Sequence, residues 1–138
     1  MAAFEFTIRV YWEDTDAGGI VFYANYLKFF ERARTEWLRA LGVSQQALRA
    51  QSGGMFVVAG ATLRYAHSAR LDDRLLVTAE LTHAGRASLA LEQQAFLAGA
   101  GTDRGHLLCS GRIRIGWVDA ATLRPSRIPE EILKKLTS

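Results

Sequence analysis

Apolar and polar residues alternate without a break over residues 4–12. One face of this segment carries Phe4, Phe6, Ile8, Val10 and Trp12. Because successive side chains of a strand point to opposite faces of a sheet, the alternation predicts a half-buried strand over the whole segment. Residues 13–19 are too rich in Asp and Gly to continue the strand, so a turn is expected to follow it.

From residue 22 to residue 41 the apolar positions recur at a spacing of three and four. They are Phe22, Tyr26, Phe29, Phe30, Ala33, Trp37, Ala40 and Leu41. This spacing predicts one long amphipathic helix, and its wide aromatic stripe predicts that the helix packs deeply against a sheet. Gly42 is suited to the position just beyond the end of the helix.

Four later segments have the alternation or the β-branched content of strands. They span residues 55–66, 75–83, 88–97 and 107–118. Gly60 indicates a bulge or a close approach of another backbone in the first of them. A short helix is expected over residues 44–50, and another helix is expected to begin after Pro129. This order predicts an α+β domain, with one long helix on one face of a five-stranded antiparallel sheet. The other face of the sheet is free for solvent or for a second subunit.

Composition narrows the class of protein. The 138 residues are 49% apolar and 22% charged, which predicts a single soluble domain over residues 1–138. The sequence shows neither an apolar run as long as a membrane span nor an N-terminal secretory signal, and its one cysteine, Cys109, suits a reducing cytoplasm. The net charge of +3 suits an anionic partner. A nucleic-acid surface is not expected, because like charges do not cluster and aromatic residues are not interleaved with basic ones.

The turn between the first strand and the long helix holds the strongest candidate for chemistry. Asp14 and Asp16 precede Gly18 and Gly19, and the helix begins about one turn later. The glycines let the backbone approach a substrate, and the start of the helix offers unpaired N–H groups. A carboxylate beside them can act as a base or as a nucleophile. The alternative is an Asp-rich turn in which both carboxylates only accept hydrogen bonds from the backbone.

Other residues are weaker candidates. Glu31 is the alternative base because it lies in the N-terminal half of the helix, although an exposed position is the simpler interpretation. His67, His83 and His106 lie at strand ends or in loops without a neighbouring nucleophile, and Cys109 belongs to an apolar strand face. No metal site is expected, because the Asp pair has no third hard ligand and no group of Cys and His has metal-ligand spacing.

The segment of residues 11–38 begins with Tyr-Trp-Glu-Asp-Thr-Asp-Ala-Gly-Gly-Ile-Val. This segment resembles the hotdog-fold thioesterases of the 4-hydroxybenzoyl-CoA thioesterase family. It looks most like the branch of acyl-CoA thioesterases associated with the Tol–Pal system, and residues 69–73 and 124–129 are also similar to that branch. The resemblance covers nearly the whole chain and implies the hotdog fold. Ala17 and Ser68 stand where members of the family carry Pro, but neither change removes a reacting group.

The resemblance also implies roles for particular residues. By position, the catalytic aspartate of the family falls on Asp16 and not on Asp14, and it acts as a nucleophile or as a general base. The backbone N–H that polarises the thioester carbonyl falls on or near Tyr23. Basic residues in the later loops of the family hold CoA, and the candidates here are Arg86, Arg124 and Arg127. From the residues alone, each of these arginines is equally a solvated loop charge.

The activity implied is hydrolysis of an acyl-CoA thioester to a free acid and CoA, without a metal or redox cofactor. The family assembles as homodimers, often paired into homotetramers, with the active site at the subunit interface, and an acyl carrier protein is the alternative acyl donor. Two rival functions of the same fold are a dehydratase and a non-hydrolytic protein that binds acyl-CoA or acyl carrier protein. The first is disfavoured because residues 1–66 contain no His.

Overall fold

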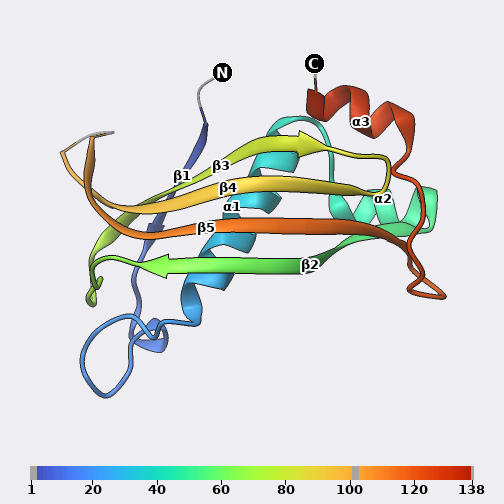
Figure 1. The fold of residues 1–138 in the computed structure, drawn as a ribbon. Helices are drawn as coiled ribbons and strands as arrows, with labels where there is room; N and C mark the ends of the chain where they lie inside the picture. The colour runs from blue at the N-terminus through green and yellow to red at the C-terminus, as the bar shows by residue number, and fades with distance from the viewer. Residues whose placement is uncertain (1–2, 101–102, 138) are drawn as a thin grey trace.

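The computed structural model describes residues 3–100 and 103–137, and it places one antiparallel sheet against one long helix (Figure 1). The strands are β1 (Phe4–Arg9), β2 (Gly54–Tyr65), β3 (Arg74–Ala84), β4 (Ser88–Ala98) and β5 (Arg104–Asp119). The helices are α1 (Asn25–Ala40), α2 (Gln45–Ser52) and α3 (Glu130–Thr137), and a 3₁₀ turn, η1, spans Trp12–Asp14. The predicted α+β class with a five-stranded antiparallel sheet is confirmed.

The order of strands in the sheet is β1-β3-β4-β5-β2. Strands β3, β4 and β5 form a meander, whereas β1 adds to the free side of β3 and β2 adds to the free side of β5. The β2–β5 pairing runs from Gly54 opposite Asp119 to Tyr65 opposite Cys109. Its register shifts between Val58 and Gly60, which confirms the bulge predicted from Gly60. Strand β2 therefore forms one edge of the sheet.

Helix α1 buries one stripe against the sheet, as its spacing predicts. The large buried side chains of the stripe are Tyr26, Phe29, Phe30, Trp37 and Leu38. The ring of Phe30 lies so close to Gly111 of β5 that a Cβ there would come within 2.9 Å of it. Truncating a buried Phe to Ala typically costs about 3–5 kcal/mol, so these rings account for much of the attachment of α1 to the sheet.

One buried polar contact also joins α1 to the centre of the sheet. Arg34 is 7% exposed, and its guanidinium donates a 2.9 Å hydrogen bond to the side-chain oxygen of Gln93 on β4. Gln93 is fully buried, and its side-chain nitrogen donates to the backbone oxygens of Phe30 and Thr78. Burial lowers the pKa of Arg34, while the charge of Glu31 opposes that shift. Because every polar atom of the Gln93 amide is used, this contact fixes the position of α1 over β4.

Strand β1 is shorter than its alternating pattern predicts. It ends at Arg9, and Trp12, expected on the buried face, is 79% exposed. The reason lies in Asp14, whose carboxylate accepts a 2.9 Å hydrogen bond from the backbone N–H of Tyr11 and folds the chain into η1. The alternation reflects only whether each side chain is apolar or polar. It therefore continues through residues at which the backbone has already left the strand.

Helix α1 also begins later than its pattern predicts, at Asn25 instead of near Phe22. Phe22 is 43% exposed, and its N–H donates to the backbone oxygen of Asp14 at 2.9 Å, which holds the residue in the turn. At the other end of the helix, Ala40 is exposed and does not widen the buried stripe. The buried face is therefore narrower than the sequence suggests at both ends.

Part of the apolar surface is uncovered in the single chain, on β2 and around the start of α1. We call it the edge surface and define it by five side chains that are each more than 40% exposed: Phe22, Tyr23, Leu27, Val58 and Tyr65. Edge strands expose unpaired backbone groups that can pair with another chain. None of the helices in the described ranges combines the length and the apolar character needed to cross a membrane.

Candidate active site

Asp16 lies on the exposed side of a small hairpin formed by residues 15–21. Its backbone N–H donates to the oxygen of Ile20, and its carboxylate accepts a 2.9 Å hydrogen bond from the N–H of Gly18. Gly19 has a φ of +79°, which the turn requires and which other residues adopt only with strain. The hairpin leaves the Asp16 carboxylate open to solvent while holding its backbone in place.

The returning arm of this hairpin is anchored to the connection between β2 and β3. The N–H of Val21 donates to the oxygen of Ala69 at 2.8 Å, and Ile20 pairs with Arg70 in an isolated antiparallel bridge. The connection is itself held by Asp73, whose carboxylate accepts the N–H of Arg70 at 2.8 Å. A segment that is distant in the sequence therefore holds the Asp16 hairpin.

Asp14 has a different role from Asp16. It is 5% exposed, and besides capping Tyr11 it offers its backbone oxygen to Phe22 and to the side-chain amide of Asn25, the latter at 2.8 Å. These contacts join η1 to the first residue of α1. Asn25 was not singled out from the sequence, because Asn at a helix start has no signal that distinguishes this contact from ordinary capping.

The start of α1 carries backbone N–H groups without acceptors. In residues 3–100 and 103–137, the N–H groups of Tyr23 and Ala24 have no hydrogen-bond partner, and no side chain caps the helix at Ala24. Such groups carry the positive end of the helix dipole. Tyr23 lies two residues before the regular helix, so its N–H is free because the chain there is still a turn.

Aromatic rings surround this turn. The ring of Tyr65, at the end of β2, lies 5.9 Å from that of Tyr23 and 5.8 Å from that of Tyr26, measured between ring centres, and the ring of Phe22 lies 4.9 Å from that of Tyr23. Tyr65 was also missed at the sequence level, because the pairing that brings β2 beside the helix start is not encoded locally. These rings form an apolar wall next to the free N–H groups.

Two buried weak acids, Tyr26 and Cys109, lie close to this turn. Tyr26 is 3% exposed, and burial raises its pKa to about 12 against the lowering effect of the Ala69 backbone. Burial also raises the pKa of the Cys109 thiol to about 12, and Cys109 is fully buried. Both groups stay protonated at neutral pH, so Cys109 is a core thiol, as predicted, and not a nucleophile.

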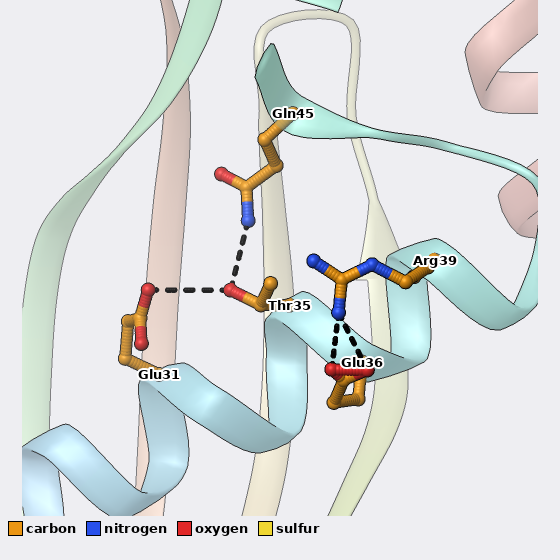
Figure 2. A network of polar contacts seen from close by, with 5 residues as sticks. All are labelled: Glu31, Thr35, Glu36, Arg39 and Gln45. Atoms are coloured by element: carbon orange, nitrogen blue, oxygen red, sulfur yellow. Dashed lines mark hydrogen bonds and ion pairs between the residues drawn. The ribbon is translucent and has the colours of Figure 1, made fainter. Parts of the chain in front are cut away.

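Glu31, the alternative base, takes part in a surface network on α1 (Figure 2). Its carboxylate accepts a 3.2 Å hydrogen bond from the hydroxyl of Thr35, which in turn accepts one from the amide of Gln45 at 3.0 Å. Glu36 pairs with Arg39 one turn further along the helix. Glu31 thus helps to fasten the start of α2 to α1, which agrees with its interpretation as an exposed residue.

The candidate CoA-binding arginines lie far from Asp16 within one chain. The backbone oxygen of Arg86 accepts the N–H of Ile128, and that of Arg124 accepts the N–H of Asp119, so all three arginines lie near the Gly54 end of β2. Tyr23 packs against Tyr65 at the other end. The twelve residues of β2 separate the two ends by about 35–40 Å at about 3.3 Å per residue. Figure 1 shows the same separation, with the Asp16 hairpin and the turn after β5 at opposite ends of the sheet.

The three arginine side chains are nevertheless available for binding. Arg86, Arg124 and Arg127 are exposed, and within the described residues none of them forms an ion pair. The structure therefore brings Arg86 and Arg127 to neighbouring segments, but it does not bring any of the three to Asp16 of the same chain. No group of three or more His, Cys, Asp and Glu in the described ranges is arranged to hold a metal ion.

A family model of the thioesterase-like superfamily matches residues 10–136, which include the hairpin, the helix start and strands β2 to β5, whereas β1 lies just before the match. The chain belongs to the thioesterase-like superfamily. The acyl-CoA thioesterase YbgC of Haemophilus influenzae is 40% identical to it over 130 residues, which cover 94% of this chain and 90% of that protein. The acyl-CoA thioester hydrolase YbgC of an Escherichia coli O6:H1 strain is 41% identical, with 94% and 92% covered. The prediction that this chain is a thioester hydrolase is confirmed.

Solved structures of thioesterases share the architecture. A probable thioesterase from Bartonella henselae superposes with a TM-score of 0.82 at 30% identity, covering 93% of this chain and all of that one. A 4-hydroxybenzoyl-CoA thioesterase variant bound to 4-hydroxybenzoyl-CoA superposes with a TM-score of 0.87 at 17% identity, covering 98% and 99%. The predicted hotdog fold is therefore confirmed for this thioesterase.

Proposed function

We propose that this thioesterase hydrolyses acyl-CoA to a free acid and CoA, with Asp16 as its catalytic carboxylate. One observation carries the proposal: an exposed, backbone-anchored Asp16 lies on a hairpin that closes immediately before the free N–H groups of Tyr23 and Ala24. Acyl-CoA as the substrate class is supported by the YbgC relatives, which are named for hydrolysis of acyl-CoA. We also propose that the protein acts in the cytoplasm, where acyl-CoA is found.

In this mechanism the thioester carbonyl oxygen accepts the N–H of Tyr23. Removing one such donor typically costs about 2.7–4 kcal/mol of barrier stabilisation. Asp16 either attacks the carbonyl carbon, with the C–S bond breaking to release CoA and water then cleaving the mixed anhydride, or takes a proton from the water that attacks the carbon. Both routes give one acid and one thiol and return Asp16 to its carboxylate form.

We propose that a complete site requires two chains. If the β2 edges of two copies pair antiparallel about a two-fold axis, the Gly54 end of one β2 meets the Tyr65 end of the other. That pairing would place Arg86, Arg124 and Arg127 of one copy toward the Asp16 hairpin of the other, where they could bind the phosphates of CoA. It would also cover the edge surface, which the single chain leaves exposed. Two such dimers would form the homotetramer expected from the family.

Release of thiol from a panel of acyl-CoA and acyl carrier protein thioesters tests the function. For Asp16→Asn we expect kcat to fall by about 10²–10⁴-fold, the usual contribution of a positioned acid or base. Binding of CoA should be nearly unchanged, because the proposed CoA contacts come from arginines. Matched control variants are Asp14→Asn, which changes a buried structural carboxylate, and Glu31→Gln, which changes the exposed one.

The outcomes separate the alternatives. Near-normal turnover of Asp16→Asn would reject its catalytic role, and a larger loss in Glu31→Gln would transfer that role to Glu31. If the wild-type protein binds the thioesters but releases no thiol from any of them, it is a non-hydrolytic binding protein of the same fold.

A further inference from the structure

Two histidines that the proposed reaction does not use lie side by side at one corner of the sheet. His67 follows the end of β2, and His106 lies near the start of β5. Their ring centres are 5.2 Å apart, the ring planes are inclined by 34°, and both side chains are exposed. His67 and His106 are far apart in the sequence. The pairing of β2 with β5, continued by the hydrogen bond from the His67 N–H to the oxygen of Leu108, brings them together.

Each ring offers a nitrogen to a ligand. The Nδ1 of His67 lies 3.1 Å from the backbone oxygen of Leu107. Because a carbonyl oxygen only accepts hydrogen bonds, Nδ1 carries the proton and Nε2 keeps its lone pair free. A metal-binding imidazole usually has this arrangement, in which a backbone oxygen orients the ring through its other nitrogen. The ring of His106 has no hydrogen-bond partner within the described ranges.

The spacing of the rings fits one shared ion. Imidazole nitrogens bind zinc at about 2.0–2.1 Å, so two of them on one tetrahedral or square-planar ion place their ring centres about 5 Å apart. The observed separation of 5.2 Å agrees with that distance. The distance between the two rings is therefore the one that a shared ion requires.

We propose that His67 and His106 form a binding site for a divalent transition-metal ion that favours imidazole, such as Cu²⁺, Ni²⁺ or Zn²⁺. Two nitrogens would come from the protein, and water would complete the coordination. This site is separate from the proposed hydrolysis, in which no metal takes part. The site has only two protein ligands. No group of three or more His, Cys, Asp and Glu in residues 3–100 and 103–137 is arranged to hold a metal ion.

An ion at this corner would stabilise the segment that anchors the Asp16 hairpin. His67 is already held to β5, because its N–H and that of Ala66 both donate to the oxygen of Leu108. Two residues further on, Ala69 accepts the N–H of Val21 in the returning arm of the hairpin. A metal bridge from His67 to His106 would therefore clamp the connection that anchors the hairpin onto β5.

The test uses the full-length protein without a histidine tag. Isothermal titration with Zn²⁺ and Ni²⁺ gives the stoichiometry, and electron paramagnetic resonance of the Cu²⁺ complex gives the number of bound imidazole nitrogens. The variants are His67→Ala and His106→Ala. The matched control is His83→Ala, because His83 is exposed on β3 and has no histidine neighbour within the described part of the chain.

We expect one ion per chain with two imidazole nitrogens in the wild-type protein and in His83→Ala. Affinity should fall at least tenfold in both His67→Ala and His106→Ala. The melting temperature should rise with added metal only in the proteins that keep both residues. An affinity that falls less than tenfold in either variant, binding that depends equally on His83, or no binding of any of the three ions would overturn the proposal.

Discussion

Asp14 and Asp16 show how far two neighbouring residues of the same type can differ. Asp14 is buried and accepts the N–H of Tyr11, whereas Asp16 is exposed on a hairpin and its side chain accepts the N–H of Gly18. The sequence pattern identifies the pair as a unit, and only the family resemblance distinguishes its members. The structural difference depends on Asn25 and Phe22 closing over Asp14, which are contacts that composition and spacing do not reveal.

Because Tyr26 and Cys109 are buried weak acids, the free energy of unfolding is expected to change with pH in the alkaline range. Both pKa values are raised to about 12, from usual values of 10.0 and 9.0. Between about pH 9 and 12 the unfolded chain therefore binds fewer protons than the folded one, so stability falls as pH rises. We expect urea midpoints to decrease steadily above pH 9 and the decrease between pH 9 and 10 to be shallower in Cys109→Ala. Parallel curves for the two proteins over that interval would contradict this account.

At the scale of elements, the types of nearly all helices and strands follow from periodicity, but their ends do not. The stripe on α1 is strong enough to predict the helix, because burial against the sheet repeats every turn. The end of β1 and the start of α1 depend instead on single hydrogen bonds to Asp14 from Tyr11 and Phe22. The pairing of β2 with β5 is equally hidden, because it joins segments separated by two other strands.

The β2–β5 pairing leads to a prediction about two glycines of one strand. A Cβ at Gly54 would lie 2.3 Å from the ring of Trp117, whereas a Cβ at Gly60 would meet nothing within 4 Å. We expect Gly54→Ala to destabilise the protein by about 1–3 kcal/mol through overpacking, and Gly60→Ala to be neutral or stabilising by up to about 1 kcal/mol. Urea unfolding of the two variants measures this difference, and equal stabilities would show that the Trp117 ring can move away without cost.

At the scale of the whole molecule, the most important feature is the distance between two sets of candidate site residues. The candidate catalytic carboxylate and the candidate CoA-binding arginines lie at opposite ends of the sheet. The sequence places both sets in the chain, but the distance between them depends on the direction of β2, which a local pattern does not specify. The same strand carries Val58 and Tyr65 of the exposed edge surface. Strand β2 therefore both separates the two sets of residues within one chain and forms the proposed contact with a second chain.

Association can be tested with one charge on that strand. Val58 is 55% exposed in the single chain, so Val58→Asp should leave the chain folded by circular dichroism. In a dimer paired through β2 the carboxylate would be buried without a partner, which costs several kcal/mol. We expect light scattering to give two or four chains for the wild-type protein and one chain for Val58→Asp, with loss of hydrolysis. Leu123→Asp, which changes a side chain that is 61% exposed in a loop, is the control and should keep both the mass and the activity. A single-chain mass for the active wild-type protein would rule out the two-chain site.

The strand order also determines when this protein can fold during its synthesis. Among the described strands, only the β3–β4 and β4–β5 pairs join strands that follow each other directly in the chain, whereas β1 must wait for β3 and β2 must wait for β5. The aromatic stripe of α1 and the apolar side chains of β2 therefore leave the ribosome well before the strands that cover or pair with them. Chains dominated by such distant pairings fold slowly and are prone to aggregate before they are complete. We expect nascent chains that end before β5 to bind chaperones, and a stable fold to form only after β5 has emerged.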